Sequence, residues 1–262
     1  MDPQYLFMAI AVFGASALQS ATGIGFGVIA GPVLLIVLNS RAAIQISIGL
    51  SLMIAAVLVP SLWRNTDRLL LLRLLAGSAA GVPIGLAVFL SIGIDHLKLL
   101  AGLAVLFTLV FLFRPGAGAK AAGAVSAGAE TAGAKRPGKL EQILLGAISG
   151  VMSGSLAMPG PVPAAWMSAR SYGKDTIRAT LLSLFIFSYL AALALQAIMT
   201  DIGRETLRHG LILAGPALAG VIAGHFLSHR LTERAFRWVL ISVLTATAAG
   251  LFLSSIPNLV AR

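Results

Sequence analysis

Cysteine is absent from the 262-residue chain, and charged residues are scarce. Without a thiol the protein has no disulfide, no thiolate metal site and no cysteine nucleophile. Charged residues make up 11% of the chain, against about a quarter in an ordinary soluble protein, and are too few to cover a globular surface. Hydrophobic residues make up 58%, which also excludes a disordered chain. The composition therefore predicts an all-α polytopic membrane protein with an aliphatic lipid-facing surface.

Catalytic and metal-binding motifs are also missing. No Asp or Glu interrupts the long apolar stretches, and the chain has neither a His-Glu-x-x-His nor a Gly-x-Ser-x-Gly motif. His225 and His229 lie one helical turn apart without an adjacent acidic partner, so they do not make a zinc site. We therefore predict no enzyme activity, no cofactor and no bound metal, and an intramembrane enzyme remains the weaker alternative.

Apolar stretches of membrane-spanning length follow one another along the chain. Crossing about 30 Å of hydrocarbon takes about 20 residues at about 1.5 Å per residue. Six stretches meet or approach this length: Ala42–Leu62 and residues 74–94, 99–113, 179–200, 210–228 and 238–261. We expect Lys98, at the start of the shortest stretch, to extend its ammonium group outward to the membrane surface.

Two further uncharged stretches do not fit a single crossing. Residues 3–40 are too long, and glycine spacing in the run TGIGFG at 22–27 weakens a helix there. We expect one helix up to about Ser20 and a second from about Phe26 to Leu38. Residues 142–169 are too short for two full crossings, and the prolines in MPGPVP at 158–163 break them.

Each of these stretches is predicted to form a helical hairpin, either re-entrant with its tip inside the bilayer or made of two short helices joined by a surface loop. Irregular backbone at membrane depth is tolerated only where protein or water covers it. The hairpin tips are therefore candidates for function. We expect them to meet near the bilayer centre and to enclose a small polar cavity.

A Gly/Ala-rich segment, residues 114–138, divides the chain into halves of similar length and has the composition of a flexible linker. The halves resemble each other weakly: the Gly-Pro-Val at 31–33 recurs at 160–162, and the Gly-x-x-x-Gly at 81–85 recurs at 220–224. We therefore divide the chain into a first membrane repeat (1–113), the linker (114–138) and a second repeat (139–262). Each repeat is a hairpin followed by three transmembrane helices.

Positive charge is distributed unevenly along the sequence. If the linker is cytoplasmic, 14 of the 19 Lys and Arg residues fall on its side of the membrane and five on the other. This is a positive-inside bias, so the net charge of +10 reports topology and does not indicate a nucleic-acid partner. Each half crosses the cytoplasmic (inner) membrane an odd number of times. The halves are therefore inverted, and both termini lie on the outer side of that membrane. Inverted repeats with broken helices are typical of secondary transporters, although a channel shares these cues.

Two runs of sequence resemble signatures of the TauE/SafE family of membrane transporters. Residues 21–51, ATGIGFGVIAGPVLLIVLNSRAAIQISIGLS, are similar to its first-repeat signature: a Gly-rich turn, a short helix with a proline, and a helix that opens with Ala-Ile. Residues 150–167, GVMSGSLAMPGPVPAAWM, resemble its second-repeat signature, with Gly-x-x-Ser-Gly ahead of a Gly-Pro turn. The family's run of three adjacent glycines is replaced here by GIGFG at 23–27 and by Met158-Pro159 in the second repeat.

The resemblance covers nearly the whole chain apart from the linker. It implies a permease or exporter of a small organic or sulfur-containing anion, such as sulfite, sulfonate or sulfoacetate, and does not name one substrate. An anion channel is the alternative, because sequence separates a channel from a carrier poorly.

An oxyanion that leaves water needs hydrogen-bond donors or positive potential, and helix N-termini supply both. The short helices after the two breaks are expected to begin near Gly25–Gly27 and near Gly160. We predict that the substrate-binding residues are Gln19, Ser20, Thr22, Gly23, Gly25, Gly27, Gln45, Ser153, Ser155, Gly160 and Arg178. The alternative for the small residues is helix packing alone, and for Arg178 a topology anchor that reaches the membrane surface.

His225 interrupts an apolar stretch, and an ionisable residue inside a membrane is a functional candidate. It either carries a coupling proton or hydrogen-bonds a neighbouring helix. The coupling ion, H⁺ or Na⁺, and assembly as a homodimer stay open at this point.

Overall fold

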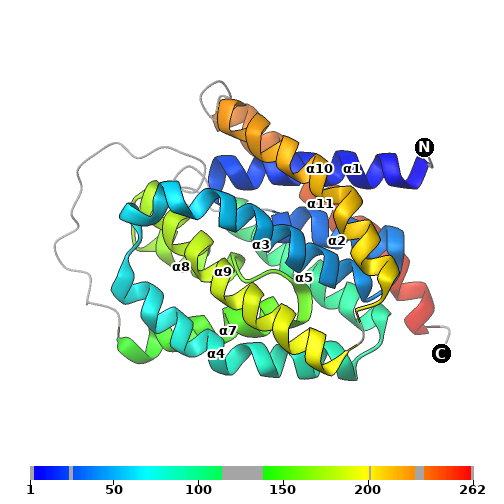
Figure 1. Cartoon of the computed structure of the whole chain (residues 1–262), viewed down its shortest axis with the longest axis horizontal. Coiled ribbons are helices and arrows are strands. Elements are labelled where there is room, and N and C mark those ends of the chain that lie inside the picture. Colours follow the sequence, from blue (N-terminus) through cyan, green and yellow to red (C-terminus); the bar gives the residue numbers. More distant parts are fainter. Residues whose placement is uncertain (1–2, 24–25, 114–137, 201, 228–232, 261–262) are drawn as a thin grey trace.

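In the computed structural model, the described residues are 3–23, 26–113, 138–200, 202–227 and 233–260. They form ten α-helices and one 3-10 turn, η1 (Trp63–Asn65), with no β-strand in this part of the chain (Figure 1). Five of the helices are long and apolar enough to cross a membrane. The prediction of an all-α polytopic membrane protein is confirmed at this level.

The helices follow the predicted order in both halves. The first half contains α1 (Pro3–Thr22), α2 (Phe26–Leu38), α3 (Ala42–Leu62), α4 (Arg68–Ser91) and α5 (Ile94–Phe113). The second contains α7 (Lys139–Leu156), α8 (Pro161–Ala169), α9 (Lys174–Met199), α10 (Arg204–Leu227) and α11 (Glu233–Val260). Several helices start a turn or more before the predicted apolar stretch, because a charged first turn is still helical. At α4 the Asp67 carboxylate caps that turn by accepting a hydrogen bond from the Leu70 N–H at 3.0 Å.

Both predicted breaks are present. The first hairpin breaks after α1, where Gly23 has a φ of 78° and donates its N–H to the Gln19 carbonyl at 2.7 Å. The second breaks after α7, where Ala157 has a φ of 60° and donates its N–H to the Ser153 carbonyl at 3.2 Å. The helices that follow have 13 and nine residues, about 20 and 14 Å, so neither crosses about 30 Å of hydrocarbon by itself.

Helices of the two halves pack against each other in a reciprocal pattern. The first helix of each half contacts the fourth helix of the other: α1 lies along α10, and α4 lies along α7 (Figure 1). The third helices of the two halves, α3 and α9, also contact each other, and so do the fifth helices, α5 and α11. The two halves are therefore interlocked and do not form two separate bundles.

Glycines allow the closest of these contacts. Gly77, Gly81 and Gly85 of α4 face α7, and a Cβ atom built on Gly81 would lie 2.1 Å from the Ala147 carbonyl oxygen. Gly146, Gly150 and Gly154 of α7 face α4 in the same way. At the α1–α10 contact, a Cβ atom on Gly220 would lie 2.3 Å from the Phe13 carbonyl oxygen. No side chain fits between these backbones, and such close packing is typical of membrane helices.

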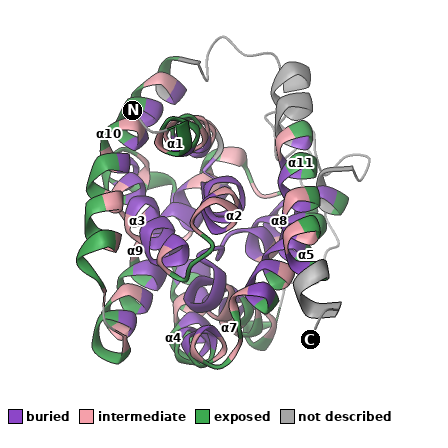
Figure 2. Cartoon of the chain, turned by 90° about the vertical axis from the view of Figure 1, so that its right-hand side faces the viewer, coloured by how far each residue is buried: buried purple, intermediate pink, exposed green. Residues whose placement is uncertain are grey.

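Most residues of α2, α3 and α8 are buried at the centre of the bundle, and α9 buries one face there, whereas α1 and α10 lie outside and expose one face (Figure 2). The outward faces carry large apolar side chains, among them Phe7, Ile10, Leu211, Ile222 and Leu253. Aliphatic groups on the outside suit a lipid environment.

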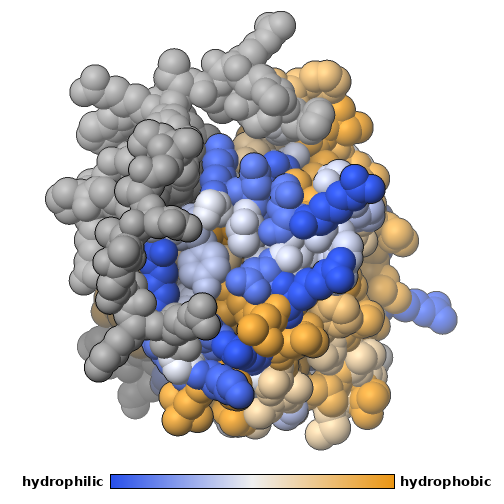
Figure 3. All heavy atoms as spheres, turned by 90° about the vertical axis from the view of Figure 1, so that its left-hand side faces the viewer, coloured by the Kyte–Doolittle hydropathy of each residue, from blue (hydrophilic) through white to orange (hydrophobic). Residues whose placement is uncertain are grey.

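Polar contacts gather at one end of the bundle, where α4, α7 and α9 begin and α8 ends. The Glu141 carboxylate accepts hydrogen bonds from the Arg170 guanidinium at 2.7 Å and the Trp166 indole N–H at 2.8 Å. Arg73 donates to Gln142 at 2.6 Å across the α4–α7 contact. Figure 3 shows the hydrophilic side chains of this end. Because Glu141 joins the start of α7 to the end of α8, the second hairpin returns to the side from which it started.

The prediction for Lys98 is wrong. Its side chain is 3% exposed, and its Nζ lies 3.9 Å from the Asp95 carboxylate. The reason is that α5 starts at Ile94, five residues earlier than expected, which places Lys98 in its second turn on an inward-facing side and gives it an acidic partner three residues before it.

Candidate functional site

The second break meets the first turn of α2 inside the bundle. A Cβ atom built on Gly27 would lie 2.1 Å from the Ala157 carbonyl oxygen, so only glycine fits at this contact. The same oxygen accepts a hydrogen bond from the phenol of Tyr189, on α9, at 2.8 Å. We call Gly27, Ala157 and Tyr189 the break junction. The expected meeting of the two hairpins is present at this point.

One turn before each break lies a buried polar group that has no hydrogen-bond partner among the described residues. Gln19 uses its side-chain oxygen to accept the Phe26 N–H, the first of α2, at 3.2 Å, and its Nε2 has no partner. The Ser153 hydroxyl is fully buried and has no partner either. Gln19 and Ser153 hold equivalent places, because the main-chain oxygen of each accepts the N–H of the left-handed residue in its break. Buried polar groups are nearly always paired, so both are candidates for ligand contact.

Helix α9 holds both hairpins with side chains on one stripe. Tyr189 and Gln196 lie 11 and 18 residues after Arg178, close to three and five helical turns. The Arg178 guanidinium donates to the Ser20 carbonyl, and the Gln196 amide donates to the Gly154 carbonyl at 3.2 Å. Arg178 Nε and Gln196 Oε1 remain buried without a partner.

Arg178 also explains the glycine at the first break. A Cβ atom built on Gly23 would lie 2.5 Å from the Arg178 Cγ, and the positive φ of Gly23 disfavours any side chain there. The Arg178 guanidinium lies at the C-terminal end of α1, where the partial negative charge of the helix dipole favours a cation.

Three predicted residues use their polar groups elsewhere in the protein. The Ser20 hydroxyl donates to the Val221 carbonyl of α10 at 2.9 Å, and the Ser155 hydroxyl donates to Val151 at 2.7 Å. Gln45 donates to Thr200, at the far end of α9, at 3.2 Å. Gly160 is buried at the start of α8, and its carbonyl accepts the Ala164 N–H at 3.0 Å. Gly25 and the side chains of Thr22 and His225 lie outside the described residues.

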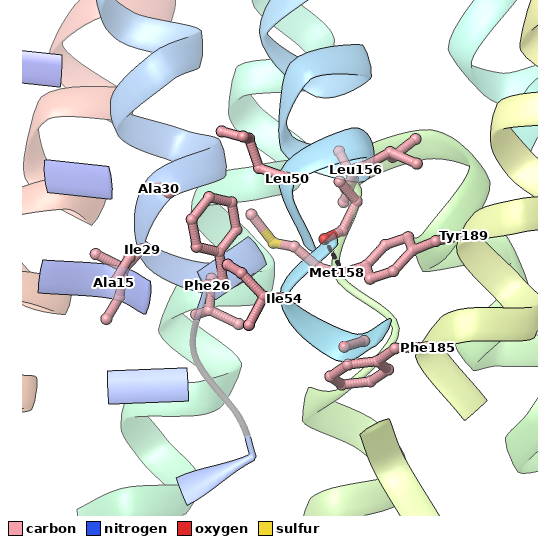
Figure 4. Close-up of a cluster of buried hydrophobic side chains, with 14 of the residues drawn as sticks. Ala15, Phe26, Ile29, Ala30, Leu50, Ile54, Leu156, Met158, Phe185 and Tyr189 are labelled. Carbon is pink, nitrogen blue, oxygen red and sulfur yellow. Dashed lines mark hydrogen bonds between the residues drawn. The ribbon is translucent and has the colours of Figure 1, made fainter. Parts of the chain in front are cut away.

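Apolar side chains fill the region around the break junction. Phe26, Ile54 and Met158 are at most 1% exposed and belong to the buried cluster that Figure 4 shows beside Tyr189. The small polar cavity that we expected between the tips is therefore closed by apolar packing among the residues described there. The physical reason is that α2 begins with Phe26 and the second break itself contains Met158, both large and apolar.

A cavity of about 570 Å³ lies between α1, α2, α10 and α11, away from Tyr189. Its wall includes Phe7, Ile10, Ile29 and Val33. Thr247, the polar side chain in that wall, donates its hydroxyl to the Val243 carbonyl at 2.6 Å. The described wall thus offers no free donor to an anion, which directs attention back to the break junction.

Sequence reasoning missed Tyr189 and Ala157. Tyr189 did leave a signal, since a tyrosine inside an uncharged aliphatic helix has to find a hydrogen-bond partner. Ala157 left none, because an alanine with a left-handed backbone is not recognisable from its residue type.

We predict that replacing Ser153 by alanine stabilises the protein in the absence of ligand. Removing a buried hydroxyl without a partner relieves part of a penalty of about 1–3 kcal/mol, so the free energy of unfolding should rise by about 1 kcal/mol. Ser255→Ala is the matched control: Ser255 is equally buried, but its hydroxyl donates to Leu251 at 2.7 Å, so its loss should destabilise. Thermal unfolding of the purified variants measures both. A lower unfolding temperature for Ser153→Ala would contradict the prediction.

Five helices long and apolar enough to cross a bilayer, with two helix breaks that meet inside the bundle, define a multi-pass membrane protein. The profile of the family described as sulfite exporter TauE/SafE matches residues 8–251. The chain therefore belongs to the TauE/SafE family, and the resemblance noted in the sequence is confirmed. Neither the curated proteins nor the solved structures contain a match to the chain.

Proposed function

We propose that the protein is a secondary transporter that moves a small organic or sulfur-containing anion, such as sulfite, sulfonate or sulfoacetate, across the cytoplasmic membrane by alternating access. The observation that carries the proposal is the break junction. There two hairpins meet, and Gln19 and Ser153 each keep a buried polar group without a partner one turn before a break. Such groups are what a desolvated oxyanion needs.

In this proposal the two halves are inverted repeats with both termini outside and the linker in the cytoplasm. Support comes from the reciprocal helix pairs, α1 with α10 and α4 with α7, which a two-fold axis in the membrane plane would generate. The short lengths of α2 and α8 favour re-entrant hairpins over full crossings.

Substrate entry requires the junction to open. Phe26, Ile54 and Met158 fill it in the present conformation, so we assign that conformation to a state closed around the site. Arg178 is then the cation at the cytoplasmic approach, and His225 remains the proposed proton carrier or helix contact. The coupling ion is H⁺ or Na⁺ in this scheme, and a homodimer is compatible with it.

Counterflow in proteoliposomes tests the function. Vesicles loaded with unlabelled methanesulfonate should accumulate labelled methanesulfonate from outside, because a carrier exchanges substrate through its alternating site. Gln19→Leu should abolish this exchange, whereas Ser255→Ala, on peripheral helix α11, should keep it. Flux that is not stimulated by internal substrate would indicate an anion channel instead. Absence of any anion flux would contradict the proposal.

The topology gives a separate prediction. Because the chain has no native cysteine, a single introduced thiol reports its own side of the membrane. Ala127→Cys, in the linker, should react with a membrane-impermeant maleimide only in permeabilised cells, since the flanking charges hold the linker in the cytoplasm. Gly93→Cys, in the exposed turn between α4 and α5, should react in intact cells. The reverse pattern would invert the whole topology.

A further inference from the structure

The helices that build the break junction carry almost no charge. There is no charged residue in 3–40, in 42–63, in 142–169 or in 179–200. Among the described residues, the cation that touches a break is Arg178, which lies against Gly23 and donates to the Ser20 carbonyl. Asp175, one turn earlier on α9, offsets part of its positive charge. Any anion held here meets at most one formal positive charge.

The remaining donors are neutral. The amide of Gln19 is 1% exposed, is anchored at the start of α2 by the Phe26 N–H and keeps Nε2 free. The Ser153 hydroxyl is fully buried and free. The start of α2 adds about half a positive charge from the aligned peptide dipoles of the helix. At the junction itself the Tyr189 phenol donates to the Ala157 carbonyl, and the neighbouring Ser51 adds another buried neutral hydroxyl.

This balance discriminates between anions by charge. The Born cost of moving an ion into a medium of low dielectric constant rises with the square of its charge, so a dianion loses about four times the solvation of a monoanion of the same size. Neutral donors and one guanidinium, whose charge Asp175 partly offsets, can compensate the desolvation cost of a monoanion but not the larger cost of a dianion. We propose that the break junction selects anions with a single negative charge, such as an alkanesulfonate or bisulfite, and rejects dianions, which are the sulfite dianion, sulfate and, near neutral pH, sulfoacetate. The inference rests on the proposed function of the same site.

Ligand-induced stabilisation of the purified full-length protein provides the test, because binding to the folded state raises its apparent unfolding temperature. Methanesulfonate has one negative charge at every pH near neutrality, sulfate has two, and sulfite changes from one to two. Between about pH 6 and about pH 8, affinity for methanesulfonate should stay constant and affinity for total sulfite should fall severalfold, while sulfate gives no shift. Methanesulfonate is the control for titration of the protein itself, because its own charge does not change with pH. The ionisable groups of the protein at the breaks are Arg178 and Tyr189, with Asp175 nearby.

The outcomes separate the two levels of the argument. Sulfate binding, or sulfite binding that strengthens as pH rises, would overturn the selection of monoanions and leave the transport proposal intact. Absence of a shift with all three anions would overturn both. Arg178→Gln should weaken methanesulfonate binding by about tenfold or more, as expected for a charged hydrogen bond. Lys174→Gln removes a charge one turn earlier on the same helix and should leave the affinity within about twofold.

Discussion

Replacing Gly81 by alanine should prevent the protein from accumulating in a folded, monodisperse form. The added methyl group would lie 2.1 Å from the Ala147 carbonyl oxygen, 2.9 Å from its carbonyl carbon and 3.0 Å from the Val151 nitrogen. All three are backbone atoms, so no side-chain rotation relieves the clash and the helices must separate. Overpacking of a tight contact costs typically about 1–3 kcal/mol, and we expect about 3 kcal/mol here because the whole α4–α7 contact is disturbed.

Gly215→Ala is the control for this substitution. Gly215 lies inside α10, with nothing within 4 Å of the added methyl group. Alanine is the better helix former by about 1 kcal/mol, so this variant should be as stable as the parent or more stable. Size-exclusion profiles and thermal unfolding of both variants provide the measurement. Equal behaviour of Gly81→Ala and Gly215→Ala would show that α4 and α7 do not hold each other as closely as described.

Replacing Gly27 by alanine should abolish stabilisation by methanesulfonate while the protein still folds. Its methyl group would lie 2.1 Å from the Ala157 carbonyl oxygen and 3.3 Å from the Tyr189 hydroxyl. The second break must then move away from α2, which displaces the acceptor of the Tyr189 hydrogen bond and separates Gln19 from the second hairpin. The disturbance is confined to a hinge between short helices, so the long helix pairs should remain assembled.

Gly31→Ala tests whether that loss is specific. Gly31 lies one turn further along α2, and an added methyl group there would make only ordinary contacts, 3.7 Å from both the Met158 Cε and the Ser47 Oγ. This variant should show the parental thermal shift with methanesulfonate. If Gly27→Ala also retains the parental shift, the break junction does not bind the anion and the site must be sought elsewhere.

The architecture was predictable because its signals are carried by residue type. A membrane span is defined by a length of apolar sequence, and Gly23 and Pro159 mark the two breaks by backbone chemistry. Helix starts were predicted less well, since Arg68 and Lys174 extend their helices beyond the apolar stretch. Lys98 was misplaced for the same reason: a sequence pattern does not show which side of a first turn faces the protein.

The site was predictable only in outline. Gln19, Gly27, Ser153 and Arg178 were chosen for being near a break. Gly27 contacts the second break, Gln19 and Ser153 lie one turn before the two breaks, and Arg178 lies against the first; their role in binding stays a prediction. Which polar groups stay unpartnered depends on contacts between distant segments. An example is the hydrogen bond from the Ser20 hydroxyl to the Val221 carbonyl, 201 residues away in the sequence. Closure of the junction by Phe26 and Met158 likewise depends on packing that one sequence does not specify.

The exchange of partners between halves sets an order of events during synthesis. A ribosome delivers α1 before α10, but the glycine-lined face that accommodates α1 belongs to α10, which emerges only after α9. Helix α4 waits only for α5, the linker and α7. The nascent chain must therefore keep α1 inserted without its permanent neighbour until α10 has emerged. If the chain were released after α9, α1 would lack its contact with α10. Quality control in the membrane can then recognise an unfinished product by the exposed α10-binding face of α1.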